Sequence, residues 1–250
     1  MSSSIWTRCA DGSERTALRL EPWRVVEGQH QVSTRKLVAS DAEQALLEDL
    51  IETVKPGRLE PARMHYLLAT PFRYPPLRHG SRFGGRFEPG LWYGAESLET
   101  AMAEVAYYRL VFLEGTEANL DGVETELTSF RARVRTEQGA DLTAGCFEAH
   151  RGALASPVSY AASQAAGADM RAAGIQAFRY PSARDEGGVG IAVFDADAFA
   201  RRKPHLLEAW HCIASRARVE MRKRDYLKRV SHAFERERFL VGDALPTPAL

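Results

Sequence analysis

Residues 71–109 read PFRYPPLRHGSRFGGRFEPGLWYGAESLETAMAEVAYYR, and the rest of the chain is organised around this segment. The segment combines arginines and tyrosines with one helix carboxylate, Glu104, in a pattern that otherwise indicates loop, short strand and helix. A guanidinium donates paired hydrogen bonds to phosphate oxygens and keeps its charge at any working pH. Arginines placed on loops in this way predict a site for a pyrophosphate ligand.

The second half of the segment predicts a strand followed by a helix. Leu91–Tyr93 has the composition of a short strand, and Ser97 is a typical capping residue at the start of a helix. Apolar residues then recur at helical spacing, namely Leu98, Ala101, Met102, Val105 and Ala106. Glu104 lies at the edge of this stripe, so we expect a half-buried carboxylate. The alternative is a surface glutamate that pairs with a nearby arginine such as Arg109.

The first half of the segment predicts that its arginines lie on loops. His65–Leu68 is apolar enough for a short strand, and Pro75–Pro76 prevents its continuation. Arg73 and Tyr74 are therefore expected where a strand leaves for a loop. Glycines on either side of Arg82 allow the backbone there to approach a ligand closely. The wording GSRFGG is not by itself a phosphate-loop or dinucleotide fingerprint.

The N-terminal part of the chain predicts an appendage to the body. Residues 1–38 show no clear period and are interpreted as an arm laid on the body. Ser40 and Glu43 form a capping-box pattern, and the apolar spacing that follows predicts an amphipathic packing helix over 41–54. The predicted division is residues 1–60 for the arm and this helix, 61–222 for the core domain, and 223–250 for a charged C-terminal helix and tail.

Two further segments carry clear patterns without an obvious chemical role. Phe130, Ala132 and Val134 alternate with arginines, which predicts one strand with a basic outer face. Residues 206–221 predict one or two strands, and the charged residues 222–238 predict a surface helix.

A hydroxyl group is predicted at another strand exit. An alanine-rich helix begins near Ser159 and ends at Gly174, and strands over 175–180 and 189–194 then flank a turn that contains Ser182. Ser182 is either a site residue or an ordinary turn residue. Together the elements predict an α+β fold with a small, curved, mixed or antiparallel sheet flanked by helices.

Composition excludes several classes of protein. The 33 basic and 33 acidic residues cancel, so no global field favours direct nucleic-acid or membrane-surface binding. Three distant cysteines, Cys9, Cys146 and Cys212, argue against a disulfide framework or a zinc site and favour a reducing cytoplasm. No apolar run reaches the ~20 residues of a membrane span. The seven histidines show no HExxH or other paired spacing of metal ligands, which argues against a metal site. No serine lies in the GxSxG motif of serine hydrolases, so a hydrolase triad has no support.

The order of Arg82, Glu104 and Ser182 resembles the RES domain family, which is named for its Arg, Glu and Ser. The three residues stand in the words GSRF, ETAMAEVAYYR and YPSAR. The likeness extends to HYLLATPFRYPP, LWYGAESLETA, RAAGIQAFRYPSARD and AWH, and it covers roughly residues 20 to 215.

The resemblance implies a fold similar to that of ADP-ribosyltransferase toxins and NAD+ as the substrate, with no further cofactor and no metal. Family members are associated with toxins of bacterial toxin–antitoxin pairs. Some are described as cleaving the nicotinamide–ribose bond with water or phosphate as the acceptor, and others as transferring ADP-ribose to a protein. The implied partner is a helix-turn-helix antitoxin that blocks the active site. A non-catalytic nucleotide-binding partner of such an antitoxin is the alternative of another class, and the oligomeric state, including a homo-oligomer, stays open.

The same resemblance suggests a role for each site residue. Glu104 would stabilise the positive charge that develops on the ribose, orient its hydroxyls or activate the acceptor. Arg82 would hold the pyrophosphate together with Arg73, and Ser182 would bind the ribose or the carboxamide. Tyr74 and Tyr93 would stack against or cover the nicotinamide. Arg86, in the wording GGRF, is the second candidate for the family arginine, and we prefer Arg82.

Overall fold

The computed structural model describes residues 4–10, 15–28, 37–54, 64–74, 79–118, 120, 122–225 and 227–247. Its α-helices are α1 (Ile5–Cys9), α2 (Asp41–Val54), α3 (Tyr66–Arg73), α4 (Leu98–Glu114), α5 (Arg151–Leu154) and α6 (Ala161–Ala172). Its strands are β1 (Thr16–Leu20), β2 (Trp23–Glu27), β3 (Trp92–Ala95), β4 (Val123–Arg131), β5 (Val134–Asp141), β6 (Ala177–Pro181), β7 (Val189–Val193), β8 (His205–Ala214), β9 (Arg218–Lys223) and β10 (Ser231–Glu235). Short 3-10 helices are η2 (Gly145–His150), η3 (Ala196–Ala198) and η4 (Arg236–Phe239).

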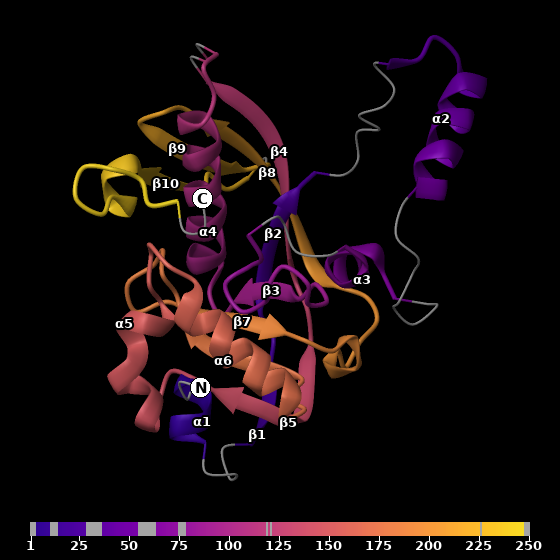
Figure 1. Cartoon of the computed structure of the whole chain (residues 1–250). Helices are drawn as coiled ribbons and strands as arrows, with labels where there is room; N and C mark the ends of the chain where they lie inside the picture. The colour runs from indigo at the N-terminus through magenta and orange to yellow at the C-terminus, as the bar shows by residue number, and fades with distance from the viewer. Residues whose placement is uncertain are drawn as a thin grey trace.

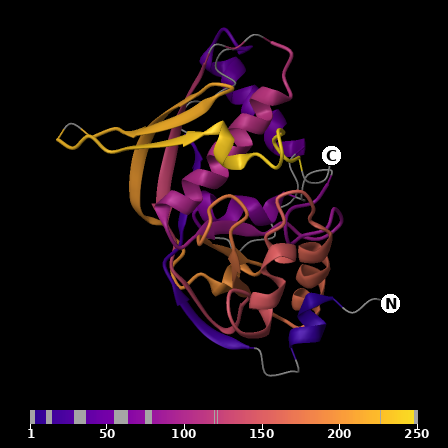
Figure 2. The same ribbon diagram turned by 90° about the vertical axis from the view of Figure 1, so that its left-hand side faces the viewer.

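All ten described strands belong to one mixed sheet in the order β1-β5-β6-β7-β3-β2-β4-β8-β9-β10. Among the described pairs only β5 and β6 run parallel. In Figure 1, β8 to β10 lie beside α4 in the upper half, whereas β5 to β7 lie beside α6 in the lower half. In Figure 2 the hairpin of β9 and β10 extends to the left of the body. The α+β fold predicted from the sequence is confirmed.

Two short chain connections, from β1 to β2 and from β4 to β5, join separate parts of the sheet. Leu20 of β1 pairs with Val134 of β5, and Trp23 of β2 pairs with Arg131 of β4. Between these pairs, the N–H of Ala132 donates to the carbonyl of Pro22 at 3.1 Å. The prediction of a single strand through Phe130, Ala132 and Val134 is therefore wrong, although all three side chains are buried as the alternation requires.

Three apolar clusters hold the helices to this sheet. The first joins α4 to β2, β4 and the β8–β10 part, with Tyr107 and Trp210 fully buried. The second joins α1 and α6 to β5, β6 and β7, and the third places α3 against Trp92 and Phe130. The long helix α4 starts where predicted, because Ser97 Oγ accepts a hydrogen bond from the Thr100 N–H at 3.0 Å.

Several local predictions are confirmed. The helix over 41–54, the strands near 91–93, 175–180 and 189–194, and the helix before Gly174 are all present with shifts of one or two residues. Gly174 has a φ of 75°, which is the left-handed conformation that ends a helix. Residues 206–221 contain two strands, β8 and β9.

The first correction concerns the segment before the arginine loop. Residues 66–73 form α3 and not a strand, since His65 Nδ1 caps the Leu67 N–H at 3.3 Å. Leu68 and Phe72, four residues apart, then face the third cluster together. Pro75–Pro76, expected to form the loop, lies outside the described residues.

Both ends of the chain also differ from expectation. The predicted arm contains β1 and the central strand β2, which the short alternation at Leu18 and Val25 did not reveal. The predicted C-terminal helix is instead the end of β9, then β10 and η4, because Phe234 is buried between exposed neighbours at a strand period.

The amphipathic helix α2 is present, but its apolar stripe is not covered. Leu46 and Leu50 are 60% and 55% exposed, so the expectation that this face packs on the body is wrong for these two residues. In Figure 1, α2 stands apart from the rest of the molecule.

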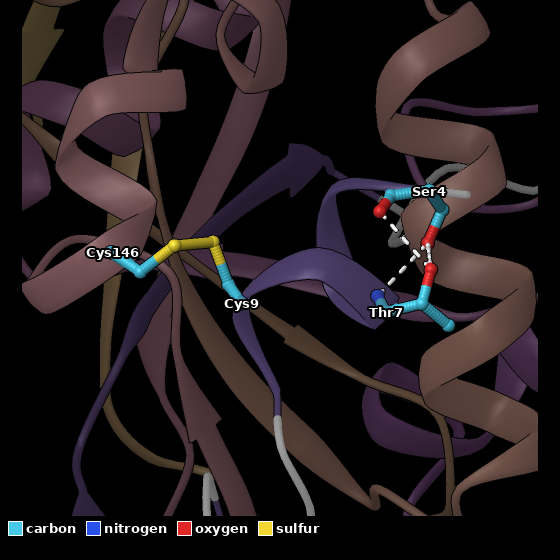
Figure 3. Close-up of a disulfide and its surroundings, with 4 residues drawn as sticks. All are labelled: Ser4, Thr7, Cys9 and Cys146. Atoms are coloured by element: carbon cyan, nitrogen blue, oxygen red, sulfur yellow. Dashed lines mark hydrogen bonds between the residues drawn. A yellow bond between two sulfur atoms is a disulfide. The ribbon is translucent and has the colours of Figure 1, made fainter. Parts of the chain in front are cut away.

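Two cysteines correct a further expectation. Cys9 and Cys146 form a disulfide, although 137 residues separate them in sequence (Figure 3). Cys212 is a buried free thiol. No helix among the described residues is long and apolar enough to cross a membrane.

Candidate active site

A cavity of about 260 Å³ opens where β2, β3, α4, β6 and β7 meet. Its lining includes six residues with chemistry of interest, namely Arg24, Arg82, Tyr93, Glu104, Tyr160 and Tyr180. Three of these, Arg82, Tyr93 and Glu104, are residues singled out from the sequence. The fold therefore brings the central part of the predicted set to one place.

Glu104 projects from the middle of α4 and is half-buried, as its place at the edge of the apolar stripe predicts. Ser182 Oγ donates to Glu104 Oε1 at 3.2 Å and accepts the Arg184 N–H at 3.1 Å. The alternative partner, Arg109, pairs with Glu27 instead. Ser182 thus holds one carboxylate oxygen of Glu104, and no described residue hydrogen-bonds the second oxygen.

Arg82 is a buried cation, 7% exposed, on the glycine-rich loop. Its Nη1 donates to the Ser156 carbonyl at 2.9 Å, and its guanidinium lies 4.9 Å from the centre of the Tyr160 ring. The described residues offer Arg82 no carboxylate partner. Neutral carbonyls orient the group without cancelling its charge, so the charge remains available to an anionic ligand.

The loop that carries Arg82 is held by α6 and by a tight turn. Gly80 has a φ of 76°, and the N–H of Ser81 donates to the Gly84 carbonyl at 2.7 Å. Gln164 Nε2 of α6 donates to the Ser81 carbonyl at 3.0 Å. A Cβ on Gly167 would lie 2.1 Å from the Phe83 carbonyl oxygen, so α6 can approach the loop this closely only with glycine there.

Tyr93 positions the same loop from β3. Its hydroxyl lies 2.9 Å from Ser81 Oγ and accepts the Phe83 N–H at 3.0 Å. Burial raises the pKa of Tyr93 to about 12, so the hydroxyl keeps its proton at neutral pH. Tyr93 is thus a cavity residue whose hydroxyl is engaged by the arginine loop.

Four predicted site residues do not line this cavity, namely Arg73, Tyr74, Arg86 and Ser182, although Ser182 donates to Glu104, which does line it. Arg73 ends α3 with its guanidinium 5.9 Å from the ring centre of Tyr74, which is exposed. Arg86 is exposed and lies over Phe87, 5.2 Å from its ring centre. Of the two candidates for the family arginine, Arg82 alone lines the cavity.

Two arginines were missed in the sequence, the half-buried Arg24 and the buried Arg184. Arg24 of β2 donates from Nη1 to the Tyr93 carbonyl at 2.7 Å, while its buried Nε has no hydrogen-bond partner. Burial lowers the pKa of Arg24 to about 10, and the group still carries its charge at neutral pH. Arg184 is 4% exposed, and its guanidinium lies 3.4 Å from the ring centre of Tyr107. The only sequence signal for Arg24 was its position between apolar residues in PWRVV.

Tyrosines form the remaining wall of the cavity, and their hydroxyls are uncharged at neutral pH. The hydroxyls of Tyr108 and Tyr160 lie 3.1 Å apart. Burial raises the pKa of Tyr180 well above the usual value. Gly190 makes room for Tyr180, because a Cβ there would lie 2.2 Å from the tyrosine ring. The cavity thus presents one carboxylate, two guanidinium groups and neutral aromatic surface, which suits a ligand with anionic and aromatic parts.

Comparison with known proteins shows the family of the chain. A family model described as the RES domain matches residues 55–215, which is most of the chain. The chain belongs to the RES domain family. The matched segment contains Arg82, Glu104 and Ser182, whereas Arg24 lies outside it.

A solved structure is also similar to this RES chain. It is described as the crystal structure of the M. tuberculosis MbcT–MbcA toxin–antitoxin complex. The match has a TM-score of 0.47 and 16% identity, and it covers 83% of this chain and 91% of that one. No protein of curated function matches the chain.

Proposed function

We propose that this RES chain is the toxin of a toxin–antitoxin pair and that it consumes NAD+ by cleaving the nicotinamide–ribose bond. The observation that carries the proposal is the placement of Glu104, fixed by Ser182, in one cavity with two guanidinium groups that lack carboxylate partners among the described residues. NAD+ combines a pyrophosphate with a cationic aromatic ring, and the cavity offers complementary groups for both.

The chemistry follows from the charge that develops at the ribose. When the bond from the ribose to nicotinamide breaks, the electron pair leaves with the neutral nicotinamide and the ribose becomes oxocarbenium-like. The free oxygen of Glu104 stabilises this positive charge, and Ser182 keeps the carboxylate in one orientation. Nicotinamide needs no proton to leave, so no histidine acid is required.

The anionic part of NAD+ is assigned to the arginines. Arg82 and Arg24 would each donate charge-assisted hydrogen bonds to the pyrophosphate, because neither has its charge neutralised by a described carboxylate. A cavity of about 260 Å³ holds part of a dinucleotide, so the adenosine end would extend outside it. Arg73 and Tyr74 stay predicted contacts for that outer part.

The acceptor of ADP-ribose is tested by the fate of NAD+ with the purified protein. Nicotinamide, ADP-ribose and ADP-ribose phosphate are resolved by chromatography, with and without phosphate. Nicotinamide release by the protein alone supports NAD+ cleavage. The dependence of this release on phosphate shows whether water or phosphate is the acceptor of ADP-ribose. If NAD+ is consumed only after cell extract is added and a protein becomes labelled, transfer of ADP-ribose to protein replaces this proposal.

The partner is proposed to be a helix-turn-helix antitoxin that covers the cavity mouth. Tyr108 lines the cavity and is 56% exposed, and Phe112, one helical turn further along α4, is 60% exposed. Apolar side chains exposed beside a binding cavity favour contact with another protein. The proposed toxicity is tested by expressing the chain with and without the product of an adjacent helix-turn-helix gene. Undiminished growth in both cases would contradict it.

A further inference from the structure

A second cluster of chemically active side chains lies away from the cavity, where α1 packs against η2. Cys9 is the last residue of α1, Cys146 lies in the first turn of η2, and His150 ends η2. One ligand atom from each of these three residues lies within 4.8 Å of the others. Figure 3 shows the disulfide that joins the two cysteines in this state.

The imidazole of His150 has no other polar contact among the described residues. It forms no side-chain cap for α5, and it makes no side-chain hydrogen bond or ion pair within the part of the chain that the structure describes. Cys146 is exposed whereas Cys9 is 4% exposed, so a solvent thiol can reach the disulfide from the Cys146 side. The third cysteine, Cys212, is buried in the cluster around α4 and takes no part.

Reduction would convert the disulfide into a ligand set. A dithiol reductant breaks the sulfur–sulfur bond by supplying two electrons and two protons, and is itself oxidised to a disulfide. A zinc ion that binds the product releases the two thiol protons and forms two zinc–sulfur bonds and one zinc–nitrogen bond, which leaves the fourth position to water. Tetrahedral zinc places such ligand atoms about 3.5 to 3.8 Å apart, which is inside the span of this cluster.

We propose that Cys9, Cys146 and His150 form a zinc site in the reduced protein. The disulfide and the metal are alternative states, because both thiolates are consumed when the sulfurs bond to each other. In either state α1 stays fastened to η2. The proposal does not depend on the reaction at the cavity.

The link between α1 and η2 matters because α1 also contacts α6, the helix that holds the loop of Arg82. Ser4 Oγ donates to Asp169 Oδ2 of α6 at 2.5 Å, and Trp6 stacks on Phe147 of η2 with ring centres 5.9 Å apart. The same α6 carries Gln164, which holds the loop of Arg82. A fastened α1 therefore supports the wall of the cavity from behind.

The test uses the full chain, reduced and then freed of reductant without oxygen, with Co2+ and Zn2+ as the probes. Thiolate ligation of Co2+ gives a strong sulfur-to-metal absorption band, which Zn2+ removes by displacement. We expect one equivalent of metal in the reduced chain and no thiolate band in the oxidised chain. The variant Cys146→Ser should lose the band, and because Cys146 is exposed this variant should still fold.

Histidine variants make the test specific. His150→Ala should weaken zinc binding at least about tenfold, whereas His211→Ala, a partly exposed histidine paired with Glu124 on the sheet, should leave it unchanged. The proposal is overturned if the reduced parent shows no thiolate band, or if His150→Ala binds zinc as tightly as the parent. It is equally overturned if Cys146→Ser retains the parent stoichiometry.

Discussion

The substitution Glu104→Gln is the sharpest test of the proposed chemistry. Glutamine keeps the size of the side chain and can still accept the hydrogen bond from Ser182, so the change removes the charge and little else. Glu104 is half-buried in a cavity with a neutral tyrosine wall, so its charge is partly screened by solvent.

The expected magnitude follows from the charge on the ribose. Two unit charges about 4 Å apart interact by about 4 kcal/mol at an effective dielectric constant near 20. Partial exposure reduces this to about 3 kcal/mol, which corresponds to roughly a hundredfold loss in kcat. KM for NAD+ should change much less, because the positive charge on the ribose develops only in the transition state.

The assay is nicotinamide release by the purified parent and variant at saturating NAD+, with the melting temperature of each measured in parallel. Glu99→Gln is the matched control, since Glu99 lies on the same helix but contacts His232 and Arg238 outside the cavity. A folded Glu104→Gln protein that releases nicotinamide at the parent rate would refute the role assigned to Glu104.

Three further substitutions test other parts of the structure. Arg24→Met should raise KM for NAD+ by roughly ten- to a hundredfold in steady-state kinetics without lowering thermal stability, because a half-buried guanidinium with an unpaired buried Nε and no described carboxylate partner is replaced by an apolar chain. An unchanged KM would exclude Arg24 as a ligand contact. Gly167→Ala should lower the free energy of unfolding by at least about 2 kcal/mol in denaturant titrations, since its Cβ would lie 2.1 Å from the Phe83 carbonyl oxygen. The control Gly152→Ala, which has open space around its Cβ, should lose none. Equal stability of the two variants would show that α6 shifts freely. Phe112→Asp should weaken antitoxin binding at least about tenfold in a titration while NAD+ consumption by the toxin alone stays at the parent rate, and unaltered binding would place the antitoxin elsewhere.

Much of the site could be predicted because its signals are local. Glu104 was expected to be half-buried from its position at the edge of one helix stripe, and Ser182 was placed at a strand exit by the glycine and proline pattern around it. The start of α4 at Ser97 depends on a hydrogen bond between residues three apart, so a short stretch of sequence contains all of its partners.

Errors occurred where short apolar runs allow more than one structure. The segment at α3 has an apolar run that suits either a strand or a helix, and the cap at His65 together with the shared face of Leu68 and Phe72 selected the helix. The charged segment around β10 has one buried residue, Phe234, whose burial depends on a cluster built by distant strands. Tertiary packing decided both cases.

Local patterns were sufficient to predict the amphipathic helix α2, the helix–turn–strand order around the cavity, and Arg82 and Glu104, which both line it. The reason is that propensity, capping and turn chemistry act between near neighbours. Long-range contacts were needed to show that the N-terminal segment enters the sheet, that Arg24 joins Arg82 in the cavity, and that Cys9 bonds to Cys146 across 137 residues. These contacts join residues far apart in the chain. They depend on strand pairing and on the burial of apolar side chains across the whole fold, which a local sequence pattern does not predict.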